Sequence, residues 1–404
     1  MNGFAVRQAQ QAEFESSGSI EGAKLTEQPA FVTLLQAIED RRGEFDRLRH
    51  VPRDVIDMMK AARIFRAATP TQFGGDALAP HHFLKMVEKI GEVDGSAAWV
   101  AAFGSANTYI AALPSETQAI IYAKGPDQVY AGGLYPLQPA ERVEGGWKVS
   151  GRWKFASGCK GADWIGVGMT GKLSPNDTDS GQAPTVKMAV CPADEVEIIE
   201  TWDVVGMQGT GSHDTQVKDK FFADAWTCDR GSPGIFDAPL YRYPPLAYQA
   251  QVHAAVNLGL ARAALNVAVD MSGGAKIMPG APILASRGYF RSGLAEGEAR
   301  LRSARSFYYE MAEQAWDELQ NNASLSLELN NLLRLSASHA AKASAQTVQD
   351  CYRIVGMAAI QRTHRMQHIL RDALVVTQHA ALNDATFENA GAVLAGMPAI
   401  AGYP

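Results

Sequence analysis

Residues 141–151, Glu-Arg-Val-Glu-Gly-Gly-Trp-Lys-Val-Ser-Gly, decide the fold class of this chain. Apolar and polar side chains alternate on both sides of Gly145-Gly146, which is the pattern of two strands joined by a tight hairpin turn. Further strand-like runs, with turn residues between them, follow at 164–169, 186–191, 196–202 and 215–222. Several short strands of this kind predict a small antiparallel barrel or sandwich, and not a doubly wound parallel sheet.

The segments on either side of this middle region have the periodicity of helices. Residues 95–113 are rich in alanine and aromatic residues and carry little charge, which predicts one buried helix. After Pro244 we expect four long helices, at about 246–273, 284–320, 325–356 and 359–380. Packed antiparallel, helices of this length make a four-helix bundle.

The order of helices, strands and helices predicts an α+β chain with segregated domains. A polar, flexible N-terminus covers residues 1–28, and a helical N-terminal domain covers 29–126. The β domain covers 127–235, and the C-terminal bundle with its tail covers 236–404.

Composition and charge argue against several classes of protein. The 404 residues are 47% hydrophobic, which is enough for a large core. The net charge of −6, without a long basic run, argues against binding to nucleic acid or to an anionic membrane. The start of the chain lacks the apolar core of a signal peptide, and no run of about 18 uninterrupted apolar residues predicts a membrane span. The four cysteines form no CxxC pair, which predicts reduced thiols in a cytoplasmic protein and no metal site.

Three local motifs of this chain resemble motifs of a known protein family. Residues 153–158 (Trp-Lys-Phe-Ala-Ser-Gly), followed by Ala162-Asp163-Trp164, resemble the flavin-contacting strand and loop of the acyl-CoA dehydrogenase superfamily. Residues 202–212 resemble its second β-domain motif, and Arg371-Asp372 resembles an Arg-Asp pair on its last long helix. The resemblance covers roughly residues 30 to 395, and it implies a helical N-terminal domain, a small antiparallel β-barrel and a C-terminal four-helix bundle.

Within that superfamily, the residues after Arg371-Asp372 separate dehydrogenases from oxygenases. Acyl-CoA dehydrogenases commonly carry a catalytic glutamate there, whereas residues 377–381 of this chain are Thr-Gln-His-Ala-Ala. Abstraction of a proton next to a thioester needs such a base, so its absence argues against dehydrogenation. An FAD-dependent acyl-CoA dehydrogenase or oxidase with a relocated base, for which Glu310 and Glu388 are candidates, is the alternative.

The same stretch looks like the flavin-dependent monooxygenases that hydroxylate phenols, secosteroids and indoles. The resemblance implies the oxygenase component of a two-component enzyme, which receives diffusible reduced FMN or FAD from a separate NAD(P)H:flavin reductase. It implies that O2 then forms a C4a-hydroperoxide on the flavin, and that a dry pocket protects this species from water. It also implies a homotetramer without a metal. S-oxygenation and N-hydroxylation on this fold remain open.

The resemblance assigns the flavin wall and two catalytic candidates. Ser157 is expected near N5 and O4 of the flavin, in a wall with Phe155, Ala156, Gly158 and Trp164. His379 is expected to hydrogen-bond the substrate or to carry a proton. The alternatives are a strand serine bonded to backbone and a core histidine at a helix end.

The resemblance assigns the substrate pocket to the low-charge helix. Trp99 and Asn107 match a Trp and a His that bind substrate in phenol-hydroxylating relatives, so Asn107 is a third catalytic candidate, and Phe103 lies between them. The alternative for Trp99 and for Phe103 is an ordinary core aromatic. Asparagine cannot take a phenolic proton, so we expect a neutral aromatic ring such as indole in preference to a simple phenol. Gly132 and Gly133 are expected either to let backbone approach the ligand or to form a turn.

The remaining predictions concern the flavin's phosphate side and the other histidines. Backbone N–H groups at Met207, Gly209, Thr210 and Ser212 are expected to contact the flavin. Arg287 is expected either to be a solvated helix charge or to reach a phosphate of a neighbouring subunit. Arg371-Asp372 is interpreted as a structural pair. The same structural interpretation applies to His213, His253, His339, His364 and His368.

Overall fold

The computed structural model describes residues 25–172, 186–273, 282–400 and 403–404. The N-terminal helices are α3 (Pro29–Leu48), α4 (Arg53–Ala61), α5 (Pro80–Val93), α6 (Gly95–Ala102), α7 (Asn107–Ile110) and α8 (Ser115–Ile121). The strands are β1 (Tyr130–Val143), β2 (Gly146–Ala156), β3 (Trp164–Lys172), β4 (Val186–Pro192), β5 (Glu197–Ile199), β6 (His213–Ala223) and β7 (Thr227–Asp229). The C-terminal helices are α9 (Pro239–Arg242), α10 (Pro245–Met271), α11 (Gly288–Asn321), α12 (Leu327–Val355), α13 (Arg365–Val376) and α14 (Asp384–Leu394).

The predicted hairpin is confirmed. β1 and β2 pair antiparallel up to Val143 opposite Gly146, so the turn consists of Glu144 and Gly145. Gly145 has a φ of 76°, in the left-handed region that a tight hairpin turn requires and that glycine adopts without a steric cost.

The sheet is mixed where a purely antiparallel one was expected. In the described residues its strand order is β5-β6-β2-β1-β3-β4-β7, and β1 pairs with β3 in parallel. After β2 the chain crosses to the opposite edge of β1, so β3 runs in the same direction as β1. Alternation of side chains along a strand sets which face is buried, but it does not specify the edge at which the next strand adds.

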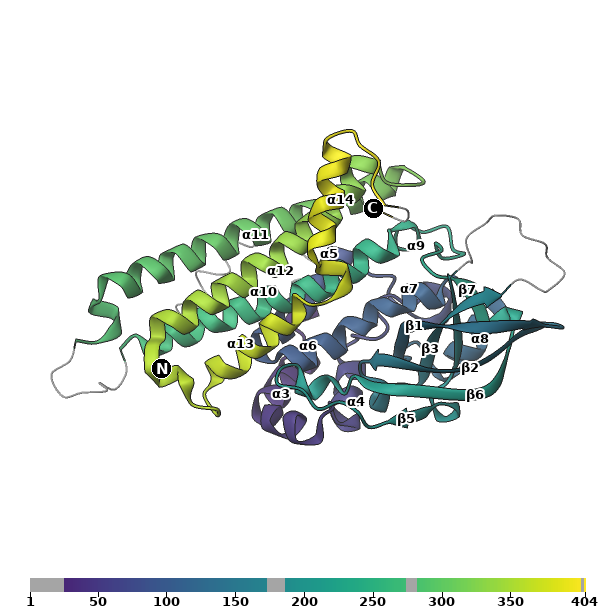
Figure 1. Cartoon of the computed structure of the whole chain (residues 1–404), viewed down its shortest axis with the longest axis horizontal. Helices are drawn as coiled ribbons and strands as arrows, with labels where there is room; N and C mark the ends of the chain where they lie inside the picture. The colour runs from purple at the N-terminus through teal and green to yellow at the C-terminus, as the bar shows by residue number, and fades with distance from the viewer. Residues whose placement is uncertain (1–24, 173–185, 274–281, 401–402) are drawn as a thin grey trace.

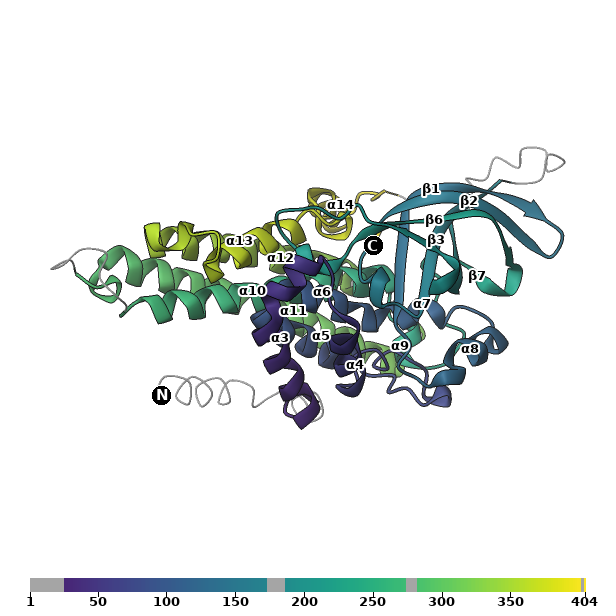
Figure 2. The same ribbon diagram turned by 90° about the horizontal axis from the view of Figure 1, so that it is seen from below.

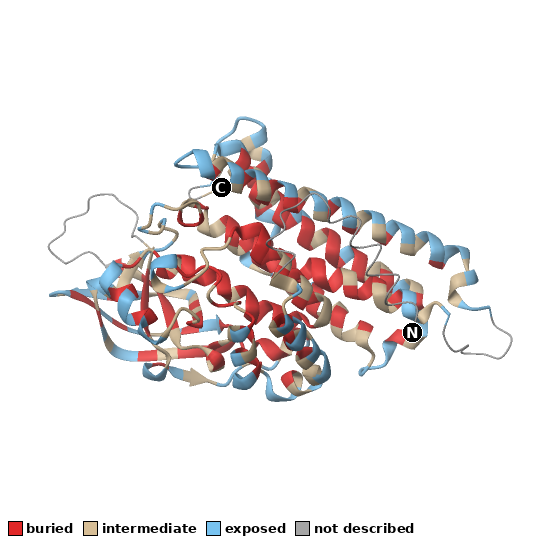
Figure 3. Cartoon of the chain, turned by 180° about the vertical axis from the view of Figure 1, so that it is seen from behind, coloured by how far each residue is buried: buried red, intermediate tan, exposed pale blue. Residues whose placement is uncertain are grey.

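Three of the four C-terminal helices lie within a few residues of their predicted ends, whereas α13 is shorter than the predicted 359–380, because it begins at Arg365 and ends at Val376. Figure 1 shows the bundle on one side and the sheet on the other, with α6 between them, and Figure 2 shows α3 and α4 against the same middle region. Buried residues concentrate along the inner helices, whereas the outward faces are exposed (Figure 3). α10 is long and apolar enough to cross a membrane, but 78% of that window is buried inside the protein, as in a core helix.

The low-charge segment after Gly95 is not one helix, contrary to the prediction. α6 ends at Ala102, a 3-10 turn, η2 (Phe103–Ala106), follows, and α7 begins at Asn107. Gly104 lies against the neighbouring chain so closely that a Cβ there would sit 2.2 Å from the carbonyl oxygen of Ile64. The Ser105 hydroxyl also donates to Ala102 O, a bond that favours bending of a helix. The break changes the direction in which Asn107 projects relative to Trp99.

Candidate active site

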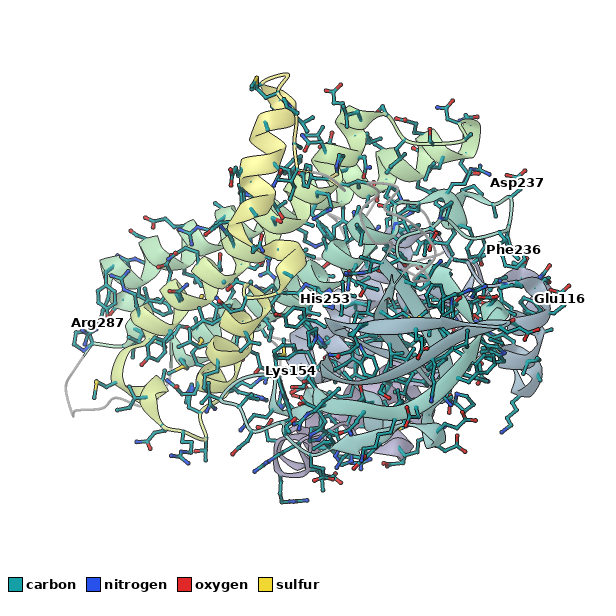
Figure 4. All side chains as sticks on the ribbon, turned by 45° about the vertical axis from the view of Figure 1, so that its right-hand side comes forward. Glu116, Lys154, Phe236, Asp237, His253 and Arg287 are labelled. Atoms are coloured by element: carbon teal, nitrogen blue, oxygen red, sulfur yellow. The ribbon has the colours of Figure 1, made fainter. Side chains whose placement is uncertain are left out.

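The candidate site begins at the bulged end of β2. Pairing with β6 shifts register between Trp153 and Ala156, and Phe155 has a left-handed φ of 62°. Such bulges redirect side chains, and strained backbone of this kind gathers at functional sites. Here it turns the ring of Phe155 outward, 58% exposed, while Ser157 is buried. Figure 4 labels Lys154 in this strand and His253 in α10 at the junction of sheet and bundle.

A chain of hydrogen bonds runs from Trp99 through three hydroxyl groups. Trp99 Nε1 donates to Ser157 Oγ at 3.2 Å, Ser157 Oγ lies 2.6 Å from Ser212 Oγ, and Ser212 Oγ lies 2.7 Å from Thr210 Oγ1. Thr210 donates its hydroxyl hydrogen to Met207 O at 2.9 Å, so it must accept from Ser212, and Ser212 must accept from Ser157. Ser157 therefore donates its hydroxyl hydrogen to Ser212. Toward a ligand, Ser157 can act only as an acceptor, through its remaining lone pair.

The glycine-rich turn that follows is held by its own protein contacts, which differs from the prediction for its N–H groups. Met207 N donates to Asp372 Oδ1 at 2.6 Å, Gly209 N donates to Ser96 Oγ at 3.1 Å, and Thr210 N donates to Met207 O. These three donors are satisfied inside the protein. The turn thus serves as a scaffold that positions the Ser157 hydroxyl chain.

A buried charge cluster anchors that turn to α13. His368 Nε2 lies 3.4 Å from Asp46 and 3.5 Å from Asp372. Burial opposes protonation of His368, but the carboxylates of Asp372, Asp46 and Asp94 outweigh it and raise its pKa to about 9. Burial raises the pKa of Asp372 to about 6, with His368 opposing the rise. At neutral pH the two groups form an ion pair, and Asp372 also holds Met207 N–H.

Arg371 does not pair with Asp372 as the structural interpretation of the Arg-Asp motif supposed. Its Nε donates to Gln367 O on the preceding turn of α13 at 3.0 Å. The partner of Asp372 is instead His368, four residues earlier on the same helix.

Three rings form a compact cluster on the helix side of the site. The centroid of His253 lies 4.1 Å from that of Trp99 and 4.2 Å from that of His379, and Trp99 lies 5.5 Å from His379. His253 Nδ1 lies 2.7 Å from Gln249 O, whereas His379 Nδ1 accepts from Ala381 N at 3.3 Å. Burial, and then the charge of Arg230, lower the pKa of His379 to about 4, so the imidazole is neutral at pH 7.

Trp99, Ser157 and His379, which come from distant parts of the chain, are thus brought together as expected. Their roles in catalysis stay predictions. His253 was missed, because it was interpreted as structural. Its signal in the sequence was a histidine one turn after a glutamine in an almost uncharged helix, and that pattern does not reveal which rings lie beside it.

A groove opens beside the ring cluster, between η2 and the start of α10. Its walls are mainly apolar and aromatic, with a few polar groups, and they include Phe103, Ala106, Tyr248, Val252 and His253. The groove has a volume of about 30 Å³, so an aromatic ring enters it only if side chains move apart. The chemistry of its walls, apolar with few polar groups, suits such a ring. Phe103 lines this groove and also packs against the core, so its contact with a substrate stays a prediction.

Asn107 is not with this cluster. Its side-chain nitrogen donates to Phe65 O at 2.6 Å and to Thr69 Oγ1 at 3.2 Å, with Gln128 O at 3.4 Å. The amide ties the loop after α4 to α7, because the break at η2 redirects it. The prediction that Asn107 stands beside Trp99 in the pocket is therefore wrong.

Trp164 and Arg287 also lie apart from Ser157. Trp164 stacks on Trp226 at 5.6 Å and donates to Gln128 Oε1, so it packs in a second apolar cluster. Arg287 is the residue before α11, and Figure 4 shows it at the far end of the bundle from His253. Within one chain it cannot contribute to this site.

Gly132 and Gly133 lie inside β1, opposite Gly166 and Val167 of β3, so the alternative of a turn is wrong. A Cβ on Gly133 would lie 3.0 Å from Trp153 Cβ and 3.2 Å from Thr215 Oγ1. The glycine makes room for packing within the sheet.

Neither a relocated carboxylate base nor a metal cluster emerges from the described residues. Glu310 and Glu388 are exposed on α11 and α14. His364 Nδ1 caps α13 by accepting from Met366 N, and His368 faces the carboxylates, so the two histidines have separate partners. No group of three His, Cys, Asp or Glu side chains in the part of the chain described is arranged to hold a metal ion.

The surface around Ser157 fits a flavin. Phe155, two residues before the buried Ser157, is 58% exposed, and Tyr135, which pairs with Lys154 in the neighbouring strand, is 67% exposed. An isoalloxazine ring would cover such side chains, and the N5 hydrogen of a reduced flavin is a donor for the free lone pair of Ser157.

Comparisons with known proteins agree with this geometry. Residues 251–384 match the family model of the acyl-CoA dehydrogenase C-terminal domain. The chain is 45% identical to an indole-3-acetate monooxygenase of Pseudomonas putida, over 93% of this chain and 95% of the relative. It is 38% identical to an enzyme of the same name in Acinetobacter baumannii, over 92% and 94%.

Two more distant matches concern the flavin. An FADH2-dependent resorcinol hydroxylase, oxygenase component, of a Rhizobium species is 28% identical over 83% of this chain and 85% of its own length. The solved structure of XiaF from a Streptomyces species, in complex with FADH2 and glycerol, has a TM-score of 0.86 at 20% identity, over 98% of this chain and 99% of that one. At that identity the second match establishes the fold.

Proposed function

The chain belongs to the flavin-dependent monooxygenases of the acyl-CoA dehydrogenase fold, as the oxygenase component of a two-component enzyme, and on that premise we propose that its substrate is an indole ring carrying a short carboxylate side chain. Indole-3-acetate, named for the two relatives that match nearly the whole chain, is the compound of this class to test first. The acyl-CoA dehydrogenase alternative is not favoured.

The observation that carries the proposal is a pair of arginines without acid partners near the groove. In the described residues, neither Arg230 nor Arg334 forms an ion pair, and Nε of Arg334 is buried without an acceptor. Arg230 is exposed to water, whereas the partly buried guanidinium of Arg334, with one donor unused, favours a bound anion. Burial raises the pKa of the groove residue Tyr109 to about 12, and the charges of both arginines act against that rise, so both lie within electrostatic reach of Tyr109.

The packing of α12 on α10 supports the placement of Arg334. Asn257 Nδ2 donates to Ala341 O at 2.9 Å, and the two helices run in the same direction. Two turns earlier, Arg334 therefore comes level with Ala250, next to the groove residue Gln249. The guanidinium of Arg334 lies over the ring of Tyr403, 5.1 Å from its centroid.

Each part of the site has a defined task. Bound reduced flavin supplies the reaction with O2 that transfers one oxygen atom to the aromatic ring. Ser157 accepts a hydrogen bond at the sheet side and so fixes the flavin's position. Trp99 and Phe103 exclude water and orient the ring, and His379, whose Nδ1 is occupied by Ala381 N–H, holds its hydrogen at Nε2 for donation.

The test is turnover with a flavin reductase, NADH and either FMN or FAD, measuring hydroxylated product and hydrogen peroxide separately. We expect indole-3-acetate to yield product, and Arg334→Met to lower kcat/KM for it about 10- to 100-fold while indole itself changes little. Arg353→Met, a highly exposed arginine on the same helix, is the control. Equal losses for indole and indole-3-acetate would contradict the carboxylate role, and peroxide alone with both would contradict the substrate class.

We also propose that the enzyme is a cytoplasmic homotetramer. Arg287 supports assembly, because its buried Nε has no acceptor in the described residues and it lies far from the site of its own chain. A measurement of the mass in solution tests the tetramer directly, and a monomer would contradict it.

A further inference from the structure

His253 differs from the other residues of the ring cluster because its unbonded ring nitrogen, Nε2, carries no hydrogen. Its Nδ1 lies 2.7 Å from Gln249 O, and a carbonyl oxygen can only accept. Nδ1 must therefore carry the ring hydrogen. Burial, and then the neighbouring His379, lower the pKa of His253 far below its ordinary value, so the ring carries a single hydrogen. It follows that Nε2 is a bare acceptor.

No group in the described residues donates to this Nε2, although His253 is only 4% exposed and lines the groove. A ligand that enters the groove shuts this atom off from water, and an acceptor shut off from water costs free energy unless it finds a donor. The neighbours do not provide one: Trp99 Nε1 already donates to Ser157, and Trp99 and His379 approach His253 with their ring systems. The donor that completes this arrangement is one that a ligand brings into the groove.

His379 has the opposite arrangement. Ala381 N–H occupies its Nδ1, so its Nε2 carries the hydrogen. The two imidazoles, 4.2 Å apart, thus present one acceptor and one donor. A ligand with one donor and one acceptor group can therefore bind this pair in only one orientation, whereas two histidines with the same free atom would not select an orientation.

We propose that His253 is the specificity-determining residue for the substrate's ring nitrogen, and that its Nε2 accepts the N–H of an indole-type ring. The inference rests on the proposed function and deepens it. A benzofuran has nearly the same shape but presents an oxygen lone pair to Nε2, and an N-methylindole presents a methyl group. A phenolate presents a negative oxygen to the same lone pair. All three leave the acceptor unpaired, whereas a pyrrole-type N–H satisfies it.

A pair of isosteric substrates tests the proposal. The full chain, with reductase, NADH and flavin, is given indole-3-acetate or benzofuran-3-acetate, and kcat/KM is measured for hydroxylated product. Leaving a buried acceptor unpaired predicts about a 10- to 100-fold preference for the indole in the wild-type enzyme. His253→Phe, which keeps a flat ring for stacking, should reduce that preference to within about threefold, mainly by slowing turnover of the indole. His253→Gln, which retains an acceptor oxygen, should restore part of it. His339→Phe, an exposed histidine of α12, should leave the preference unchanged.

Binding to the wild-type protein gives a second measurement that does not depend on how the variants fold. Calorimetry should give a dissociation constant for indole-3-acetate at least about tenfold lower than for benzofuran-3-acetate. Equal binding and equal turnover of the two compounds would overturn the role of His253 and leave the proposed function standing. If neither compound binds or yields product, the proposed substrate class fails and this inference fails with it. A preference that survives unchanged in a folded His253→Phe would assign the selection to another residue.

Discussion

At the sheet side of the site, the hydroxyls of Ser157, Ser212 and Thr210 form one continuous chain of hydrogen bonds, whereas at the helix side Nε2 of His253 and of His379 has no partner in the described residues. The first arrangement is closed: every hydrogen is already donated inside the protein. The second is open, and a ligand must complete it. A satisfied network fixes geometry, and an unsatisfied group at a groove binds.

The closed side depends most on Asp372, so its removal should have the largest effect. Asp372→Ala leaves Met207 N–H without its acceptor and takes one carboxylate from a charged, buried His368. Breaking a buried pair in this way costs about 3–5 kcal/mol of unfolding free energy. Urea denaturation measures it, with Asp384→Ala as the control, because Asp384 pairs with Lys342 at the exposed surface. A loss no larger than in the control would show that the turn does not depend on this anchor.

On the open side, His379→Phe should affect chemistry far more than stability, although it removes the acceptor of Ala381 N–H. The variant keeps a ring beside Trp99 and His253 but has no hydrogen to donate, so product formation should fall about 100-fold, which corresponds to about 2.7 kcal/mol. Oxidation of reduced flavin should continue and end as hydrogen peroxide. The ratio of product to peroxide measures this, and His379→Gln, which keeps an N–H donor, should recover part of it. An unchanged ratio in the phenylalanine variant would rule out donation by His379.

The pH dependence of stability should distinguish the two sides as well. The pKa of His368 is raised from its ordinary 6.5 to about 9 by Asp372, Asp46 and Asp94 against the cost of burial, with the cation of Arg365 nearby. The stability that its charge contributes is fully present below pH 6.5 and is lost as the pH rises through about 9.

Thermal unfolding at pH 6, 8 and 9.5 should therefore show a decline on the order of 2 kcal/mol in the wild-type protein. The decline should be flatter in His368→Gln. His253 and His379 are neutral throughout this range, so His253→Phe should decline as the wild type does. The same slope in all three proteins would mean that His368 is not charged in the folded state.

How much of this was predictable from sequence depends on whether a feature is local. The hairpin follows from the adjacent pair Gly145-Gly146, although the turn itself lies one residue earlier, at Glu144-Gly145, and the long helices follow from periodicity. The parallel pairing of β1 with β3 does not, because alternation of side chains is the same at either edge of a strand. Trp99, Ser157 and His379 were identified through a family resemblance.

The errors have physical causes of the same kind. Asn107 was misplaced because close packing of Gly104 on Ile64 O breaks the helix between it and Trp99. His253 was missed because its importance depends on two rings from distant parts of the chain and on one backbone carbonyl. The N–H groups of residues 207–210 were assigned to a ligand because the sequence does not show that Asp372 and Ser96 already use two of them.

The smallest effect on stability is expected for Ser212→Ala, which tests whether the direction of the hydroxyl chain at the sheet side matters for the reaction. Ser212→Ala removes the acceptor for the Ser157 hydrogen and should cost about 1 kcal/mol in unfolding free energy, a typical value for one neutral hydrogen bond. It also frees that hydrogen to point toward the flavin, so Ser157 becomes a donor where the wild type presents only a lone pair. If the lone pair matters, peroxide release should rise several-fold relative to product, although Ser157 itself is unchanged. Ser303→Ala, an exposed serine on α11 bonded to its own helix, should alter neither quantity. A stability loss without a change in the ratio would mean that Ser157 acts through its position alone and that the direction of the hydroxyl chain has no consequence for the reaction.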